Sequence, residues 1–290
     1  MLRSGNTSRR RFLKAAAVGF SLPASLRAAA PAPLRFGTTP VFLDDQLALL
    51  NAWQTYLQSV LQRPVQFVQR GSYREIVDLL LSDGLDVAWV CGFPYVVNEA
   101  RMRLVAVPLY QGQPLYRSHL VVPANDTATR TVLDLRGRVF AYSDPQSNSG
   151  YLVPRVELIR AHEAPATFFR RAFYTFAHRK VVEAVQVGLA QAGSVDGFVW
   201  DTLQLQQPAA TAGVRVAWRS AEHGFPPIVA RPSLAIEETE QLATALVDMP
   251  RSEAGRTILH RLNIDGFTPG APQLFDSIRA LVRQHRGALE

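Results

Sequence analysis

The chain has 290 residues, 48% of them hydrophobic, and a formal net charge of +7. This length allows one large domain or two medium lobes. Six of the 31 basic residues and none of the 24 acidic residues lie within residues 1–30, so the rest of the chain carries 25 basic against 24 acidic side chains. A body this close to neutrality gives no reason to bind nucleic acid. Because Cys91 is the only cysteine, the chain cannot form an internal disulfide.

Residues 1–30 have the parts of an export signal. The basic motif SRRRFLK is followed by the apolar run AAAVGF and then by small residues up to Ala30. Its paired arginines, with Phe12, Leu13 and Lys14, resemble a twin-arginine signal, and a chance basic N-terminus is the alternative. No later run reaches the roughly 18 apolar residues of a membrane span. We therefore expect residues 1–30 to be a cleaved signal peptide and the mature protein to be soluble outside the cytoplasm, with no membrane span.

Strand and helix patterns alternate over residues 34–90. They are a strand at Leu34–Thr39, a helix at Asp45–Leu61, a strand at Val65–Val68, a helix over residues 72–84 and a strand at Asp86–Val90. The second helix has Ser72 as its N-cap and Glu75 three residues later, which is the pattern of a capping box. This β-α-β-α-β order predicts a parallel sheet with helices on its faces.

The rest of the chain predicts a second α/β unit and a return to the first. The patterns are two strands within residues 104–123, a strand at Val139–Tyr142, a helix from about residue 150 to 162, a helix at Arg179–Gln191, strands at Val195–Val199 and Val214–Ala217, and helices at Ile236–Leu246, Ser252–Leu262 and Gln273–Gln284. We predict an α/β fold of two lobes with a ligand cleft between them. Lobe 1 comprises residues 31–120 and 220–290, and lobe 2 comprises residues 121–219. One doubly wound domain that carries an enzyme site is the alternative.

The segment DPQSNSGY, Asp144–Tyr151, is the most informative for function. A strand ends before it, its Asp-Pro pair predicts a turn, and Ser147, Asn148 and Ser149 precede a helix that begins near Gly150. Small polar side chains beside the free N–H groups of a helix N-terminus can bind an anion without any Lys or Arg. Gly150 would let the backbone approach that ligand closely. Ordinary N-capping is the alternative.

The same segment resembles the D-P-x-S-x-S-G-Y-L-x-P motif of the periplasmic phosphate-, phosphite- and phosphonate-binding proteins of ABC transporters. Further matching segments follow in the expected order: GTTP (37–40), GSYREIVDLLLSDGLDVAWVCGFPYV (71–96), YRSHLVVP (116–123), DLRGRVFA (134–141) and HRKVVEAVQVGLAQAGSVDGFVWD (178–201). The resemblance implies a type II-like bilobed periplasmic binding protein. Such a protein is a monomer without a cofactor, is not an enzyme, and delivers a small oxyanion to an ABC permease.

Carried over by position, the resemblance also implies which residues bind the ligand. We expect the ligand site to be formed by Thr39, Tyr73, Cys91, Tyr95, Tyr116, Ser118, Ser147, Asn148, Ser149, Gly150, His178 and Asp201. The three residues before Gly150 would donate hydrogen bonds to the oxyanion. Core packing is the alternative for each tyrosine, and helix capping is the alternative for His178. No second His, Cys or carboxylate stands at ligand spacing near His178, so we predict no metal site.

Arg179 bears on which oxyanion binds. In aminophosphonate-binding relatives an acidic residue follows the histidine that corresponds to His178, and here Arg179 follows it. A cation at this place would repel an ammonium group, although Asp201 matches a family position that can be acidic. We therefore expect a smaller or purely anionic ligand instead of 2-aminoethylphosphonate. A solvated residue at a helix start is the alternative for Arg179.

Cys91 leaves two further alternatives open. It follows a strand, where open α/β sheets place their ligand crevice, and a small buried apolar side chain is its ordinary role. Some arsenite sensors resemble the same family, use a cysteine in the cleft and act with a sensor histidine kinase, so arsenite is the alternative ligand. A thiol hydrolase using Cys91 and a histidine is the enzyme alternative. It lacks a recognisable nucleophile motif, and G-x-S-x-G is absent.

Overall fold

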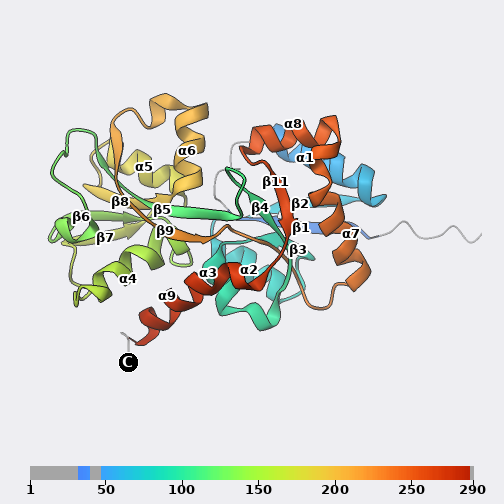
Figure 1. Ribbon diagram of the computed structural model, residues 1–290, viewed down its shortest axis with the longest axis horizontal. Helices are drawn as coiled ribbons and strands as arrows, with labels where there is room; N and C mark the ends of the chain where they lie inside the picture. Colours follow the sequence, from blue (N-terminus) through green and yellow to red (C-terminus); the bar gives the residue numbers. More distant parts are fainter. Residues whose placement is uncertain (1–31, 40–46, 288–290) are drawn as a thin grey trace, which may run out of the picture. The chain divides into compact units, whose positions relative to one another are not determined.

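The computed structural model describes residues 32–39 and 47–287 (Figure 1). The predicted signal peptide, its cleavage site and the first two residues of the helix predicted at Asp45–Leu61 lie outside these residues. The chain divides into Met1–Pro31 and a compact unit, Ala32–Glu290. Within the described part of the chain, none of the helices is both long enough and apolar enough to cross a membrane.

The first half of the fold is a six-stranded sheet in the order β11-β4-β10-β3-β1-β2. Its strands are β1 (Leu34–Thr38), β2 (Val65–Gln69), β3 (Val87–Trp89), β4 (Arg103–Leu109), β10 (Ile228–Ala230) and β11 (Gly266–Pro269). As predicted, β1 pairs in parallel with β2 and β3. Because β10 and β11 pair antiparallel with their neighbours, the complete sheet is mixed.

The helices of this half contact the sheet directly or pack against one another. They are α1 (Leu47–Leu61), α2 (Tyr73–Leu81), α3 (Gly92–Val97), α7 (Ile236–Val247), α8 (Glu253–Leu262) and α9 (Asp276–Gly287). The apolar stripe of α1 buries Trp53 completely against Phe36 of β1, with ring centroids 5.5 Å apart. The predicted start of α2 is confirmed, because the hydroxyl of Ser72 accepts the N–H of Glu75.

The second half is a five-stranded sheet in the order β7-β6-β8-β5-β9. Its elements are β5 (Leu115–Pro123), β6 (Val139–Tyr142), β7 (Arg171–Tyr174), β8 (Ala192–Asp196), β9 (Val214–Gly224), α4 (Val153–Arg160), α5 (His178–Gln186) and α6 (Gly197–Gln206). Strand β6 has the predicted bounds and pairs in parallel with β7 and β8, whereas β5 pairs antiparallel with β8 and β9.

The predicted strand Val195–Val199 is wrong in its second half. Strand β8 ends at Asp196 and helix α6 begins at Gly197. The carboxylate of Asp196 caps this helix by accepting the N–H of Phe198 at 2.9 Å. A short apolar run such as SVDGFVW is compatible with a buried strand or a buried helix, so periodicity alone could not place the boundary.

The chain crosses from one sheet to the other between β4 and β5 and returns between β9 and β10 (Figure 1). The last helix, α9, then contacts both α3 and α4. Two sheets, each with its own helices and joined by paired crossings, confirm the predicted bilobed α/β fold. The residue limits given above for the two lobes stay a prediction.

Candidate functional site

The segment after β6 forms a tight, buried turn. Ser147 caps a turn of π-helix, Asn148–Leu152, which continues into α4, and its hydroxyl accepts the N–H of Gly150 at 2.9 Å. Ser147, Asn148, Ser149 and Gly150 are all buried. Single π-helical turns are rare and often occur at functional sites. The helix expected near Gly150 therefore begins two residues earlier, with a wider turn.

Gly150 is required by close packing. A Cβ at this position would lie 1.8 Å from Ser143 Oγ and 3.1 Å from His178 Cε1. The Ser143 hydroxyl is buried and has no hydrogen-bond partner among the described residues. A buried hydroxyl without a partner costs free energy, so it marks a place where a ligand oxygen or a water would be accommodated.

Asn148 connects the turn to two predicted site residues. Its N–H donates to Cys91 Sγ at 3.2 Å, and its Nδ2 donates to Tyr116 Oη at 3.0 Å. Asn148 Oδ1 is buried and finds no partner within the described ranges. Since Tyr116 Oη accepts from Asn148, the phenolic proton remains available to donate.

Two serines behind the turn hold it in place. The carbonyl oxygen of Ser149 accepts from Ser118 Oγ at 2.7 Å and from Ser194 Oγ at 2.8 Å. The Ser149 hydroxyl lies close to the Tyr116 phenol and influences its pKa, but makes no hydrogen bond of good geometry with any described residue. Ser118 therefore positions the backbone of the turn, and sequence reasoning missed its partner Ser194.

His178 and Tyr73 form a pair whose protons can be assigned. The N–H of Asp196 donates to His178 Nδ1 at 3.1 Å, so Nδ1 carries no proton. Burial lowers the pKa of His178 to about 3, which keeps the ring neutral with its proton on Nε2. Nε2 lies 3.2 Å from Tyr73 Oη and donates to it. The Tyr73 hydroxyl proton is therefore available for another acceptor.

Asp144 joins the two halves of the fold. One of its carboxylate oxygens accepts the N–H of Tyr73, the first residue of α2, at 3.2 Å, and the other accepts the N–H of Gln146 at 2.7 Å. Burial raises the pKa of Asp144 and outweighs these hydrogen bonds. The turn after β6 is thus held against the first helix turn on the other sheet.

Cys91 lies where β3 leads into α3, beside the same turn. The side chain is buried, and burial raises the pKa of its thiol to about 11. It is therefore a neutral thiol near physiological pH. Within the described residues, no group of three or more His, Cys, Asp or Glu side chains could hold a metal ion.

Three expected residues do not hydrogen-bond to this cluster. Asp201 accepts the hydroxyl proton of Tyr110 at 2.6 Å, and it lines a pocket to which Ser147, Asn148, Ser149 and Gly150 do not contribute. Tyr95 packs its ring edge against Phe275 with centroids 4.7 Å apart. The Thr39 hydroxyl donates to the carbonyl of Trp89 at 3.2 Å.

The cluster offers hydroxyl and amide donors but no cationic donor. Within the described ranges, no Lys or Arg side chain hydrogen-bonds to Ser147, Asn148, Ser149 or Gly150.

Burial raises the pKa of Asp196 to about 7. Sequence reasoning missed this residue as well, although an Asp-Gly pair directly after a strand is a recognisable helix-start signal.

Two lobes joined by paired crossings, with a buried cluster of donors where their loops meet, define the class of bilobed solute-binding proteins. A family model described as the periplasmic phosphonate substrate-binding protein of an ABC transporter matches residues 36–275. The chain belongs to this family, which confirms the resemblance noted in the sequence.

Two curated proteins illustrate the relationship. The phosphate-import protein PhnD of Mycolicibacterium smegmatis is 27% identical over 150 residues, which is 48% of this chain and 46% of that protein. The match thus spans about half the length of that relative. The phosphonates-binding periplasmic protein of Escherichia coli is 23% identical over 258 residues, 86% of this chain and 75% of that protein.

Solved structures share the fold. The binding component of a phosphonate ABC transporter from Pseudomonas aeruginosa superposes with a TM-score of 0.79 at 21% identity, covering 88% of this chain and 87% of that one. PhnD1 of Prochlorococcus marinus, solved with methylphosphonate, gives a TM-score of 0.78 at 19% identity, covering 87% of this chain and 98% of that one.

Proposed function

We propose that this chain binds a small phosphorus oxyanion of the phosphonate, phosphite or phosphate class and delivers it to an ABC permease. The observation that carries the proposal is the buried turn Ser147–Gly150 together with the unused hydroxyl donors beside it. Among the described residues, the hydroxyl protons of Tyr73 and Tyr116 have no acceptor, and the Ser143 hydroxyl has no hydrogen-bond partner. Neutral donors without another acceptor can stabilise an oxyanion as an oxyanion hole does.

The proposed ligand is a singly charged oxyanion that keeps one hydroxyl group. No cation neutralises a second negative charge within the described cluster, and Asp144 and Asp196 are buried beside it. A dianion would meet these carboxyl groups with unfavourable electrostatics, whereas a ligand hydroxyl could donate to one of them. An ammonium group would also meet the positive charge of Arg179, which follows His178 in the sequence. We therefore expect 2-aminoethylphosphonate to bind more weakly than the smaller anions.

Calorimetric titration of the mature chain with phosphate, phosphite, methylphosphonate and 2-aminoethylphosphonate tests the proposal. We expect the purely anionic ligands to bind, and the double variant Ser147→Ala, Ser149→Ala to weaken them at least about tenfold, since each lost hydrogen bond to a charged group is worth roughly 1.5–3 kcal/mol. Ser59→Ala, at an exposed position in α1, is the matched control. Failure of all four ligands to bind, or unchanged affinity in the double variant, would refute the proposal.

Catalysis is not part of the proposed function. A thiol hydrolase needs a thiolate and a base that accepts its proton. The pKa of Cys91 is raised to about 11, and both ring nitrogens of His178 are already hydrogen-bonded. Incubation with phosphonates should therefore return them unchanged.

A sensory role with arsenite is the second candidate. It rests on the position of Cys91 Sγ, 3.2 Å from Asn148 N within the same cluster. Arsenite would condense with the thiol, forming an As–S bond and releasing water, and the partner would be a sensor histidine kinase. If Cys91→Ser binds arsenite as well as the unsubstituted chain, the thiol has no role and this candidate is lost.

We also propose that the protein reaches the periplasm by the twin-arginine route and acts as a monomer. The support is the motif SRRRFLK and the family's periplasmic location. Replacing Arg9 and Arg10 by lysine should retain the full-length chain in the cytoplasm. Export of this variant at the normal level would exclude the route.

A further inference from the structure

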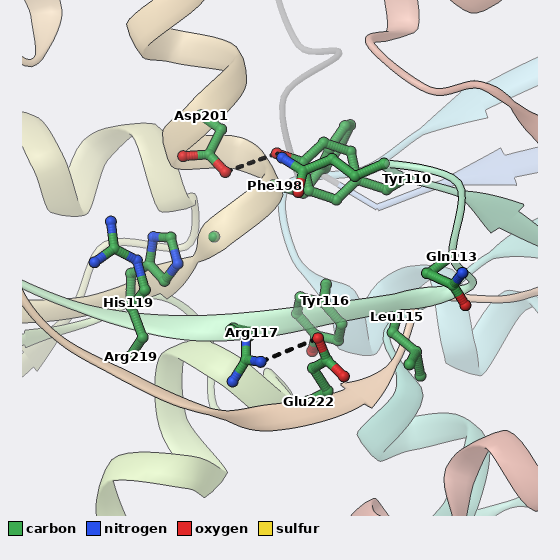
Figure 2. Close-up of a pocket in the computed structure, with 12 residues that line it drawn as sticks. Tyr110, Gln113, Leu115, Tyr116, Arg117, His119, Phe198, Asp201, Arg219 and Glu222 are labelled. Carbon is green, nitrogen blue, oxygen red and sulfur yellow. Dashed lines mark hydrogen bonds and ion pairs between the residues drawn. The ribbon is translucent and has the colours of Figure 1, made fainter.

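A pocket lies beside β5, β9 and the start of α6, with a volume of about 430 Å³ (Figure 2). The strands contribute Arg117, His119, Arg219 and Glu222 to its lining, and α6 contributes Gly197 and Asp201. The segment between β4 and β5 completes one side with Tyr110. The proposed oxyanion site uses none of these side chains.

Strand alternation separates this pocket from the oxyanion site. Along β5, the side chains of Tyr116 and Ser118 hydrogen-bond to the turn after β6. Arg117 and His119 alternate with them and line the pocket. Successive side chains of a strand point to opposite faces of its sheet, so the two sites lie on opposite faces of β5. Tyr116 lines the pocket as well and is their shared wall.

Arg219 is the unpaired cation of the pocket. It stands opposite His119 in the β5–β9 pairing, and Figure 2 shows the two side chains next to each other. Arg117, by contrast, is paired with Glu222 at 3.0 Å and donates to the Ser220 carbonyl at 2.7 Å. The Arg219 guanidinium makes no ion pair or hydrogen bond with any residue that the structure describes.

His119 adds a neutral donor beside Arg219. It is only 4% exposed, and its Nδ1 is buried without a partner in the described part of the chain. Its Nε2 faces the start of α6, where a Cβ on Gly197 would lie 2.7 Å from it. Burial lowers the pKa of His119 to about 4, so the ring is neutral and can donate through one nitrogen.

Asp201 supplies the opposite charge. It is half-buried at the first turns of α6, and one of its oxygens accepts the hydroxyl proton of Tyr110 (Figure 2). Among the described residues it has no salt bridge with a cationic side chain. Burial raises its pKa, whereas the hydrogen bond from Tyr110 and, to a smaller extent, the charge of Arg219 lower it. Of the two arginines and two carboxylates in the lining, Arg117 and Glu222 pair with each other, whereas Arg219 and Asp201 have no ion-pair partner among the described residues.

We propose that this pocket binds a small zwitterion, with its anionic group at Arg219 and His119 and its ammonium group at Asp201. A simple anion would satisfy Arg219 but leave the Asp201 carboxylate unpaired. A simple cation would satisfy Asp201 but leave Arg219 unpaired. A molecule that carries both charges satisfies both groups at once, and charge-assisted hydrogen bonds are the stronger class.

Calorimetry of the full chain with glycine, β-alanine and 4-aminobutanoate tests this proposal, because these amino acids place the two charges at increasing separation. Butanoate and butylamine are the single-charge controls. We expect one ligand per chain for at least one zwitterion and binding at least about tenfold weaker for both controls. Arg219→Gln and Asp201→Asn should each weaken the zwitterion about tenfold, as loss of a charged hydrogen bond predicts.

Two control variants show whether zwitterion binding depends on this pocket. Arg171→Gln removes the same charge from β7, at the opposite edge of the same sheet, and should leave binding unchanged. The double variant Ser147→Ala, Ser149→Ala should also retain zwitterion binding while its affinity for the oxyanion falls. Absence of binding by all three zwitterions, equal binding of butanoate, or full affinity in Arg219→Gln would each overturn the proposal. The ligand comparison needs no variant, so it does not depend on how the variants fold.

Discussion

At residue 150 the backbone approaches its neighbours too closely for any side chain. Ser143 and His178 occupy the space that a Cβ would need. The turn can therefore pack its N–H groups and hydroxyls into one small volume.

Gly150→Ala should damage both stability and binding. Overpacking of a buried site costs on the order of 1–3 kcal/mol, and the turn must move to relieve the contact with Ser143. We expect a lower denaturant midpoint and at least about tenfold weaker oxyanion binding. Gly71→Ala is the control, because its nearest neighbour would be 3.7 Å away. Equal midpoints for the two variants would show that the turn is not tightly packed.

Asp196 makes folding stability depend on pH. Burial raises its pKa from 3.8 to about 7 in the folded chain, so between these values the folded state binds more protons than the unfolded state. Its stabilising contribution is complete below pH 3.8 and is lost as the pH rises through 7. Asp196→Asn removes this titration and keeps a good N-cap. The variant should gain stability relative to the unsubstituted chain between about pH 5 and pH 8, measured by urea unfolding. A constant difference across that range would contradict the shift.

At the scale of elements, β5 and β8 hold the turn after β6. Ser118 on β5 and Ser194 on β8 both donate to one carbonyl oxygen, that of Ser149. A carbonyl oxygen accepts two hydrogen bonds, so either serine alone leaves it satisfied. The two strands therefore support the turn redundantly.

This redundancy predicts non-additive mutations. Ser118→Ala and Ser194→Ala should each cost about 1 kcal/mol. The double variant should cost more than the sum, because it leaves a buried carbonyl without a partner. A double-mutant cycle of urea unfolding measures the coupling. Simple additivity would mean that water replaces the lost donors.

At the scale of the whole molecule, contacts between segments of the two sheets converge on the proposed oxyanion site. The Tyr73 N–H meets Asp144, and Cys91 meets the N–H of Asn148. A ligand bound there would contact residues of both halves. Binding to the folded state alone stabilises it according to ligand concentration and affinity.

Saturating oxyanion should therefore raise the melting temperature of the mature chain. At one hundred times the dissociation constant, the gain is about 2.7 kcal/mol. Differential scanning fluorimetry with methylphosphonate measures it. The double variant Ser147→Ala, Ser149→Ala should show little of this increase, and an equal increase in both proteins would place the ligand elsewhere.

Much of the fold was predictable from local sequence patterns. Apolar patterns and capping residues place β1, α2 and β6 correctly, because a buried strand appears as a short apolar run and a helix start is marked by its N-cap, both within a few neighbouring residues. The antiparallel strands β10 and β11 were harder to predict. Their pairing with β4 joins residues far apart in the chain, and no local pattern records such a partner.

The sequence by itself indicated the family and singled out Asp144–Tyr151 as the segment most informative for function. It could do so because ordered motifs and helix-start chemistry are properties of neighbouring residues. Only the tertiary structure decided which distant side chains meet that segment. It brings Tyr73, Cys91 and Tyr116 to it, and leaves Asp201 hydrogen-bonded to Tyr110 in a pocket across β5. The physical reason is that the direction of a side chain follows from its place along a strand or at a helix start. Which other side chains it meets depends on how distant strands pair.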